Sequence, residues 1–279
     1  MAIAELKEAL TLLRRMPLLW IPGIAGGSLA AALWITLNLS GTFFAGRLVV
    51  FSGLVLFIFT TGMLTIIRKN EGTIRELLAG GIRYYFRVLL PQLVIISGVI
   101  FVFILLTVTF SLIGIADVNI VTALTVGFMI PTLFLTFFYD TAAVFEDRRV
   151  FESIRRSIQL VIAHINAVIV FLLVSLAIFV GVVLALMIIW EAFLYDKLEP
   201  LSRYNETQLQ TLSPDQLVAM IGPGGIGITA IILFFGIFLL LPILYSYKAC
   251  FFKKLAGGVI ITQQPTTGEF DNKGRWYKY

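Results

Sequence analysis

The sequence predicts an all-α, polytopic membrane protein with six transmembrane helices. Of its 279 residues, 59% are hydrophobic and 13% are charged, and the mean hydropathy is +0.98. A soluble domain carries about a quarter charged residues, because water must solvate its surface. Six stretches are long enough to cross about 30 Å of hydrocarbon, and none contains Asp, Glu, Lys or Arg. We therefore expect the chain to be integral to the plasma or inner membrane of a cell.

The predicted spans divide the chain into a transmembrane domain and a tail. The spans cover residues 17–38, 48–67, 88–112, 120–139, 165–190 and 226–247. Together they form a domain over 1–258 with one long outer loop over 191–225, and a polar cytoplasmic tail covers 259–279. Pro131 and Pro242 lie inside spans four and six and are expected to kink them.

The distribution of basic residues predicts the orientation of the chain. Of the 21 Lys and Arg residues, 18 lie in the N-terminal segment and in the segments that follow spans two, four and six. Such residues resist translocation, so both termini are expected to be cytoplasmic. Asp140 directly follows span four on this side, where we expect water to solvate it.

Amphipathic helices are predicted at the cytoplasmic face, where they would lie in the plane of the lipid headgroups. Two segments match when one is shifted by 76 residues, and each carries its apolar residues on one face of a helix. These apolar residues are Ile74, Leu78, Ile82, Tyr85, Phe86 and Leu89 in the first segment, and Val150, Ile154, Ile158, Val161, Ile162 and Ile165 in the second. A third, weaker segment has Ile3, Leu6, Leu10 and Leu13 on one face, and Glu5, Lys7 and Glu8 facing away.

A basic pair follows spans two, four and six: Arg68 and Lys69, Arg148 and Arg149, and Lys253 and Lys254. With the interfacial helices, these pairs suggest a threefold internal repeat of helix, span, span and basic stop. The alternative is that basic residues collect at every cytoplasmic boundary without any repetition.

These basic residues are the predicted contacts for membrane lipids, which we expect to be anionic. The predicted lipid-contact residues are Arg68, Lys69, Arg83, Arg87, Arg148, Arg149, Arg155, Arg156, Lys253 and Lys254.

Small residues recur at four-residue spacing in three spans, which allows helix backbones to approach closely in lipid. They are Gly23, Gly27 and Ala31 in span one, Ala123 and Gly127 in span four, and Ala177, Gly181 and Ala185 in span five. Packing within the chain is the favoured interpretation, and a face for a second copy is the alternative.

The outer loop contains the pattern of a helix start. Ser213 is a predicted N-cap, Pro214 suits the first helical position, and Gln216 completes a capping box. A helix to about Met220 is expected, ended by the cluster of Gly and Pro residues at 222–225.

The motifs of several activities are absent from the sequence. No ionisable residue lies within a predicted span, which argues against proton-coupled transport and intramembrane hydrolysis. A single Cys and a single His exclude a disulfide scaffold and a Cys–His metal cluster, and no P-loop is present. We therefore predict no catalytic, cofactor or metal site and no enzyme activity. The basic residues lie beside spans rather than on a separate domain, so no nucleic-acid partner is expected.

The order of elements, with interfacial helices before spans and a basic stop such as Phe251, Phe252, Lys253 and Lys254 after them, resembles a group of prokaryotic six-span proteins. This group includes the membrane domain fused to glycerophosphodiester phosphodiesterases. The long outer segment before the last span is similar to that of permease subunits of ABC-2-type exporters. The second resemblance implies a separate ATPase subunit as partner.

The sequence therefore predicts a non-catalytic membrane protein that organises the bilayer or serves as a scaffold. Its cationic cytoplasmic rim is expected to contact anionic lipids, and a protein partner is expected as well. One alternative is the permease subunit of an ABC-2-type exporter. Another is an assembly subunit of a larger membrane complex.

Overall fold

The computed structural model describes residues 2–70, 72–114, 118–200, 204–205, 213–258, 268–270 and 276–278. The helices are α1 (Ala2–Arg15), the short 3₁₀ helix η1 (Pro17–Trp20), α2 (Ile21–Ser40), α3 (Thr42–Lys69), α4 (Ile74–Leu112), α5 (Val118–Leu135), α6 (Tyr139–Phe145), α7 (Val150–Ala163), α8 (Ile165–Leu198) and α10 (Pro214–Gly258). In the tail, β1 (Gly268–Phe270) pairs antiparallel with β2 (Trp276–Lys278). Six helical segments of the described chain are long and apolar enough to cross a membrane, so the predicted all-α polytopic fold is confirmed.

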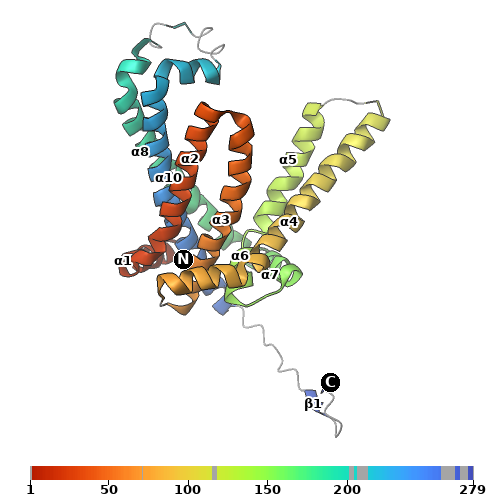
Figure 1. Cartoon of the computed structure of the whole chain (residues 1–279). Coiled ribbons are helices and arrows are strands. Elements are labelled where there is room, and N and C mark those ends of the chain that lie inside the picture. The colour runs from red at the N-terminus through yellow and green to blue at the C-terminus, as the bar shows by residue number, and fades with distance from the viewer. Residues whose placement is uncertain are drawn as a thin grey trace.

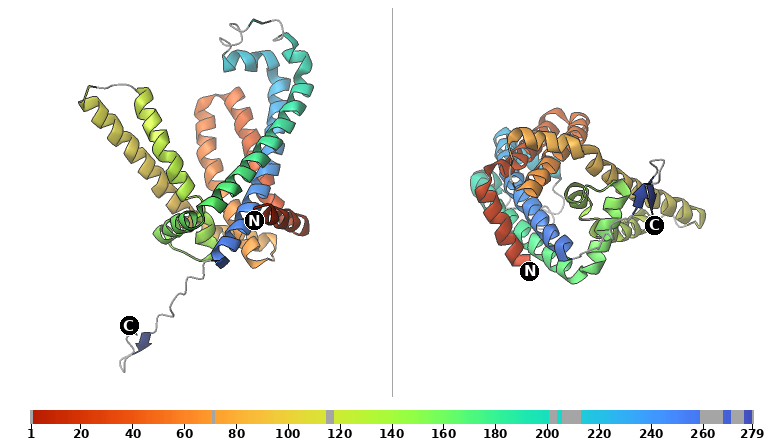
Figure 2. Two further views of the ribbon diagram at one scale, coloured as in Figure 1. Left: turned by 180° about the vertical axis from the view of Figure 1, so that it is seen from behind. Right: turned by 90° about the horizontal axis from the view of Figure 1, so that it is seen from below.

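Three helical hairpins rise from a common base (Figure 1). They are α2–α3, α4–α5 and α8–α10, and they diverge toward the opposite end of the molecule, as the views in Figure 2 also show. We call the end that holds α1, the start of α4, α6 and α7 the basal end. Each hairpin begins with a helix at this end, which follows the predicted order of elements; the repetition of sequence itself stays a prediction.

The first hairpin packs closely on α10 because glycines face that helix. A Cβ atom added to Gly23 or Gly27 would lie 2.5 Å from the Phe238 carbonyl oxygen or 2.6 Å from the Phe234 carbonyl oxygen. Neither contact leaves room for a side chain, so these two glycines allow the backbones of α2 and α10 to approach.

The other predicted packing stripes differ from this pattern. An added Cβ at Gly127 in α5 or Gly181 in α8 would meet no described atom within 4 Å. Three further members of these stripes, Ala123, Ala177 and Ala185, are exposed, while Ala31 in α2 is half-buried. The expectation of packing within the chain is therefore wrong for the stripes of α5 and α8. Small residues at four-residue spacing allow another helix to pack closely, but they do not determine whether a helix lies opposite them.

Glycines that the spacing rule did not select join α3 to α4. A Cβ added to Gly62 would collide with the Leu77 carbonyl oxygen, and one added to Gly81 would collide with the Ile58 carbonyl oxygen. The predicted interfacial helix over 74–89 and the third span form one continuous helix, α4, which runs along the basal end before it rises (Figure 1). Its start is fixed by a capping box, in which the Thr73 amide donates to Glu76 Oε2 at 2.9 Å.

The fourth span is interrupted after Leu135, four residues beyond Pro131, where a kink was predicted. Pro131 lies inside α5, and the helix ends at Leu135 and resumes as α6 at Tyr139. Ser157 of α7 binds across this break: its hydroxyl accepts from the Phe138 amide and donates to the Leu135 carbonyl, both at 2.9 Å. Backbone groups freed by the break are thereby satisfied within the protein, as an apolar environment requires.

The predicted helix start in the outer segment is confirmed, but the loop is shorter than expected. The Ser213 amide donates to Gln216 Oε1 at 2.9 Å, and the Gln216 amide donates to Ser213 Oγ at 3.2 Å. Gly222 then breaks α10 with a φ of 62°. The helix of span five continues to Leu198, so 191–198 are helical rather than loop.

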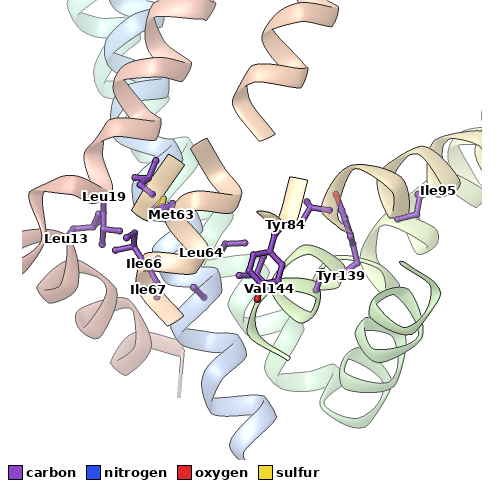
Figure 3. Packing of buried hydrophobic residues seen from close by; sticks show 14 residues of the cluster. Leu13, Leu19, Met63, Leu64, Ile66, Ile67, Tyr84, Ile95, Tyr139 and Val144 are labelled. Atoms are coloured by element: carbon purple, nitrogen blue, oxygen red, sulfur yellow. The ribbon is translucent and has the colours of Figure 1, made fainter. Parts of the chain in front are cut away.

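Buried apolar side chains concentrate at the basal end (Figure 3). One cluster joins Leu13 and Leu19 to Met63 and Ile66 of α3, and extends through Tyr84 of α4. A second cluster joins α1, α6, α7, α8 and the end of α10, with Phe138, Phe171, Tyr247 and Phe252 fully buried. These two clusters join the three hairpins at the basal end.

Candidate functional site: the charged basal end

The apolar face predicted for the start of α4 remains largely open, and those predicted for α1 and α7 are open in part. Ile82 and Phe86 of α4 are 65% and 64% exposed, and Ile3 of α1 is 66% exposed. These helices pack on the rest of the protein through other sides, such as Leu77, Gly80 and Tyr84 in α4. Each helix therefore has exposed apolar side chains in addition to those that pack against the rest of the protein.

Glu5 does not face away from the protein as predicted. Its carboxylate is buried against α10 and lies 2.8 Å from Lys254 Nζ. Burial acts to raise the pKa of Glu5, but the hydrogen bond and charge of Lys254, with smaller backbone and N-terminal contributions, hold this pKa below its ordinary value. The heptad-like spacing of Ala2, Glu5 and Ala9 places the acid on the side that packs against α10.

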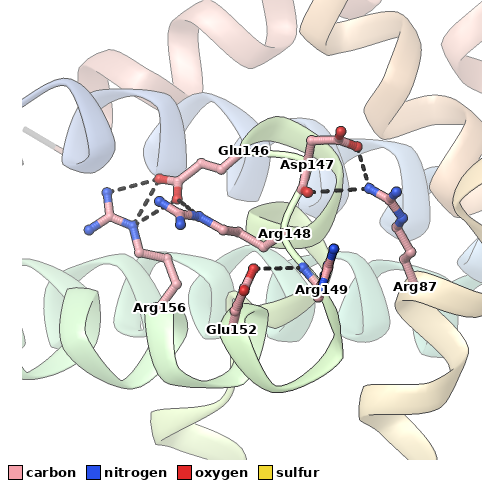
Figure 4. A network of polar contacts seen from close by, with 7 residues as sticks. All are labelled: Arg87, Glu146, Asp147, Arg148, Arg149, Glu152 and Arg156. Carbon is pink, nitrogen blue, oxygen red and sulfur yellow. Dashed lines mark hydrogen bonds and ion pairs between the residues drawn. The ribbon is translucent and has the colours of Figure 1, made fainter. Parts of the chain in front are cut away.

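Half of the ten predicted lipid-contact residues form ion pairs within the chain. These pairs are Lys69 with Glu76, Arg87 with Asp147, Arg148 and Arg156 with Glu146, and Lys254 with Glu5. Figure 4 shows the network between α6 and α7, in which Glu146 lies between two guanidinium groups. The basal end is therefore a mixed-charge surface rather than the purely cationic rim that the sequence suggested.

Arg156 is the clearest departure from the predicted rim. Only 7% of it is exposed, and its Nε donates to the two oxygens of Glu146 at 2.9 and 3.0 Å. It shares a helical face with Ser153 and Ser157, and this face turns toward the α5–α6 break. The guanidinium is therefore turned into the protein, where lipid does not reach it, because polar backbone at the break attracts the polar side of α7.

Two basic residues bind the carbonyl ends of neighbouring helices. Arg68 Nη1 donates to the Val144 carbonyl at 2.7 Å and to the Tyr84 hydroxyl at 3.0 Å, and Lys253 Nζ donates to the Ile67 carbonyl at 2.8 Å. The last carbonyls of a helix lack partners within it and carry partial negative charge. The basic stops thus connect one hairpin to the next.

Three of the predicted lipid-contact residues form no ion pair within the described part of the chain. Arg83, Arg149 and Arg155 are exposed, and none forms an ion pair with a residue that the structure describes. The Arg83 guanidinium lies 5.5 Å from the centroid of the Tyr84 ring. These three cations are available to a ligand.

A pocket of about 400 Å³ opens between α3, the start of α4 and the α6–α7 loop. We call it the α3–α4 pocket; it is lined by Thr65, Arg68, Lys69, Glu76, Ala79, Gly80, Arg83, Tyr84 and Asp147. Three predicted lipid contacts, Arg68, Lys69 and Arg83, therefore share one cavity. Gly80 contributes to its wall because α4 approaches α3 so closely there.

The expectation that Asp140 is solvated is wrong. Asp140 is 4% exposed and Lys248 of α10 is 8% exposed, and their charged atoms lie 2.7 and 2.9 Å apart. The Thr141 amide also donates to Asp140 Oδ1 at 2.6 Å. Both residues belong to helical segments that qualify as spans, so the basal part of the membrane domain contains a buried ion pair.

No local signal in the sequence could have identified this pair. The two residues are separated by 108 positions, and each looks like a boundary residue beside an apolar run. Among the described residues, no group of three or more His, Cys, Asp or Glu side chains is placed to hold a metal ion.

Comparisons of the chain with protein-family models, with curated proteins and with solved structures found no match.

Proposed function

We propose that this integral membrane protein binds the phosphate of anionic lipid headgroups in the α3–α4 pocket and thereby organises the surrounding bilayer, without catalysing a reaction. The observation that carries this proposal is the convergence of Arg68, Lys69 and Arg83 on one cavity of about 400 Å³. Guanidinium groups bind phosphate through paired, charge-assisted hydrogen bonds. Each such cation near an anionic surface contributes about 1 kcal/mol of attraction.

The position of the pocket supports this proposal. It lies at the end of α3 and beside the first turns of α4, whose Ile82 and Phe86 are exposed. Because 18 of the 21 Lys and Arg residues are expected on the cytoplasmic side, we assign the basal end to the cytoplasmic leaflet. Exposed apolar side chains on α4 would then enter the headgroup boundary, with the pocket at the level of the phosphates.

The test compares lipid retention by matched Arg variants of the full chain. Arg83→Gln removes an exposed pocket cation that forms no ion pair with a described carboxylate, whereas Arg155→Gln removes another exposed cation, on α7 outside the pocket. Anionic phospholipid that remains after detergent purification is extracted and counted by mass spectrometry. We expect retention to fall several-fold in Arg83→Gln and to stay near wild type in Arg155→Gln. Equal retention in all three proteins would reject the pocket as a lipid site.

The alternative roles, a permease subunit driven by a separate ATPase or an assembly subunit, require a stoichiometric protein partner. A pull-down in mild detergent with mass spectrometry distinguishes them from a lipid-binding protein that acts alone. A co-purifying nucleotide-binding subunit would favour the permease role, and any other fixed partner would favour the assembly role.

A further inference from the structure

The α3–α4 pocket contains acidic as well as basic side chains. Glu76 of α4 and Asp147 of the α6–α7 loop line the same cavity as its three cations. Resting on the proposed function, we infer that the pocket selects a phosphate ester that also carries a primary amine, as in the headgroup of phosphatidylserine. The cations would bind the phosphate, and the carboxylates would bind the ammonium.

Of the two guanidinium groups in the pocket, one is fixed and one is free. Arg68 is held in place by its hydrogen bonds to the Tyr84 hydroxyl and the Val144 carbonyl. Arg83 forms no ion pair with any described residue, and it lies one helical turn from Ala79 and Gly80 in the pocket wall. A phosphate between these two guanidinium groups would gain charge-assisted hydrogen bonds without displacing a carboxylate.

The acidic side is occupied by partners that are exposed to solvent. Lys69 Nζ lies 3.4 Å from Glu76 Oε1, and the side chains of this pair are 54% and 44% exposed. Arg87 pairs with Asp147, and these side chains are 43% and 47% exposed. Exposed ion pairs are screened by water and contribute little to stability. An ammonium group that enters the pocket can therefore replace Lys69 at Glu76 or Arg87 at Asp147, and Lys69, which lines the pocket, then remains free for the phosphate.

The size of the cavity suits a headgroup rather than a bare phosphate. A volume of about 400 Å³ greatly exceeds the ~30 Å³ that one water molecule occupies in the liquid. A phosphate alone would leave both carboxylates with their present partners. An amine-bearing phosphoester reaches both kinds of charge at once.

The two carboxylates can be neutralised without loss of their structural roles. Glu76 accepts a hydrogen bond from the Thr73 amide in the capping box, and Gln serves equally well at this position. Asp147 has a φ of 55°, and Asn tolerates this left-handed conformation as well as Asp does. The double variant Glu76→Gln/Asp147→Asn therefore tests charge and leaves the backbone intact.

The experiment uses two lipids with the same net charge. The purified full chain is placed in nanodiscs of phosphatidylcholine with equal amounts of phosphatidylserine and phosphatidylglycerol, and bound lipids are counted by native mass spectrometry. We expect wild type to retain about tenfold more phosphatidylserine than phosphatidylglycerol, the effect of one added charge-assisted hydrogen bond. The Glu76→Gln/Asp147→Asn variant should retain the two lipids about equally, and its binding of phosphatidylglycerol should not fall below that of wild type, because Lys69 and Arg87 are then released from their carboxylates.

The outcomes separate this inference from the proposed function. Equal retention of the two lipids by wild type, with loss of both in Arg83→Gln, would overturn the amine preference and keep the lipid site. No loss of either lipid in Arg83→Gln would reject the site itself. An excess of dissolved O-phosphoserine identifies the source of the ligand: failure to displace phosphatidylserine supports a lipid, and displacement would assign the pocket to a soluble amine-bearing phosphate.

Discussion

The basal half of α3 and the far half of α4 are both built from apolar sequence but pack very differently. In an apolar stretch of 18 residues in α3, 44% of the residues are buried, and these are Thr60 to Ile67 toward the basal end; in such a stretch of α4, 6% are buried. Apolar side chains gain little from leaving lipid for protein, so hydrophobicity alone does not bring membrane helices together. The contrast shows that specific contacts decide where these helices meet.

The specific contacts differ in kind between the two regions. The basal end has glycines against backbone, the Asp140–Lys248 pair and the Glu146–Arg156 pair. In the far half of α4, the described side-chain hydrogen bonds are those of Thr107 and Thr109 to carbonyls of their own helix. Such bonds stabilise a helix but connect it to nothing else.

The largest expected effect comes from breaking the buried ion pair at the basal end. Asp140→Asn leaves the Lys248 ammonium buried without a counter-charge, and the free energy of unfolding should fall by about 3–5 kcal/mol. The measurement is denaturant titration of the purified chain in detergent micelles. Adding Lys248→Met should restore part of the loss, because the unpaired charge is then gone. A single variant as stable as wild type would show that water reaches this pair.

A smaller effect is expected from matched glycine substitutions that compare the two regions directly. Gly27→Leu forces a side chain against the backbone of Phe234 and should lower the free energy of unfolding by about 1–3 kcal/mol. Gly127→Leu places the same side chain on α5, where no described atom lies within 4 Å of an added Cβ, and should leave stability unchanged. Both are measured by the same titration. If Gly127→Leu destabilises the chain instead, α5 has a partner in detergent.

The smallest effect is a pH dependence at the contact between α1 and α10. The folded-state pKa of Glu5 lies below its ordinary value of 4.5, so the ionised carboxylate stabilises the fold above that pH, and this contribution is lost as the pH falls through the lower pKa of the folded state. Compared with wild type, Glu5→Gln should be less stable at neutral pH, and the difference should shrink on acidification. Thermal unfolding at a series of pH values measures it. A difference that is constant with pH would contradict the ionised pair.

Much of the secondary structure could be predicted because its causes are local. A span requires about 20 consecutive apolar residues, and six such runs are visible in the sequence. The capping box of Ser213 and Gln216 depends on residues three positions apart, so its two hydrogen bonds follow from the order of residues. The start of α7 at Val150 agrees with the apolar spacing that predicted an amphipathic helix there.

The sequence could predict which basic residues belong to the candidate site, but not how they are arranged. The sequence identified Arg68, Lys69 and Arg83 as cations near the membrane, but their shared pocket depends on Gly80 and Gly81 drawing α4 onto α3. It assigned Arg156 to the same rim, although the face of α7 that carries it is turned inward by the α5–α6 break. Helical periodicity shows which residues share a face of a helix, but it does not show which neighbouring element that face contacts.

By itself, the sequence determined the six apolar helices, their caps and the supply of charge at one end of the molecule, because each depends on residues close together in the chain. The tertiary structure alone decided which charges are neutralised and which glycines are in contact. Asp140 meets Lys248 across 108 positions, and Lys253 meets Ile67 across 186. Electrostatic and packing energies depend on distances in space, and for residues so far apart in the chain only the folded arrangement of the helices sets those distances.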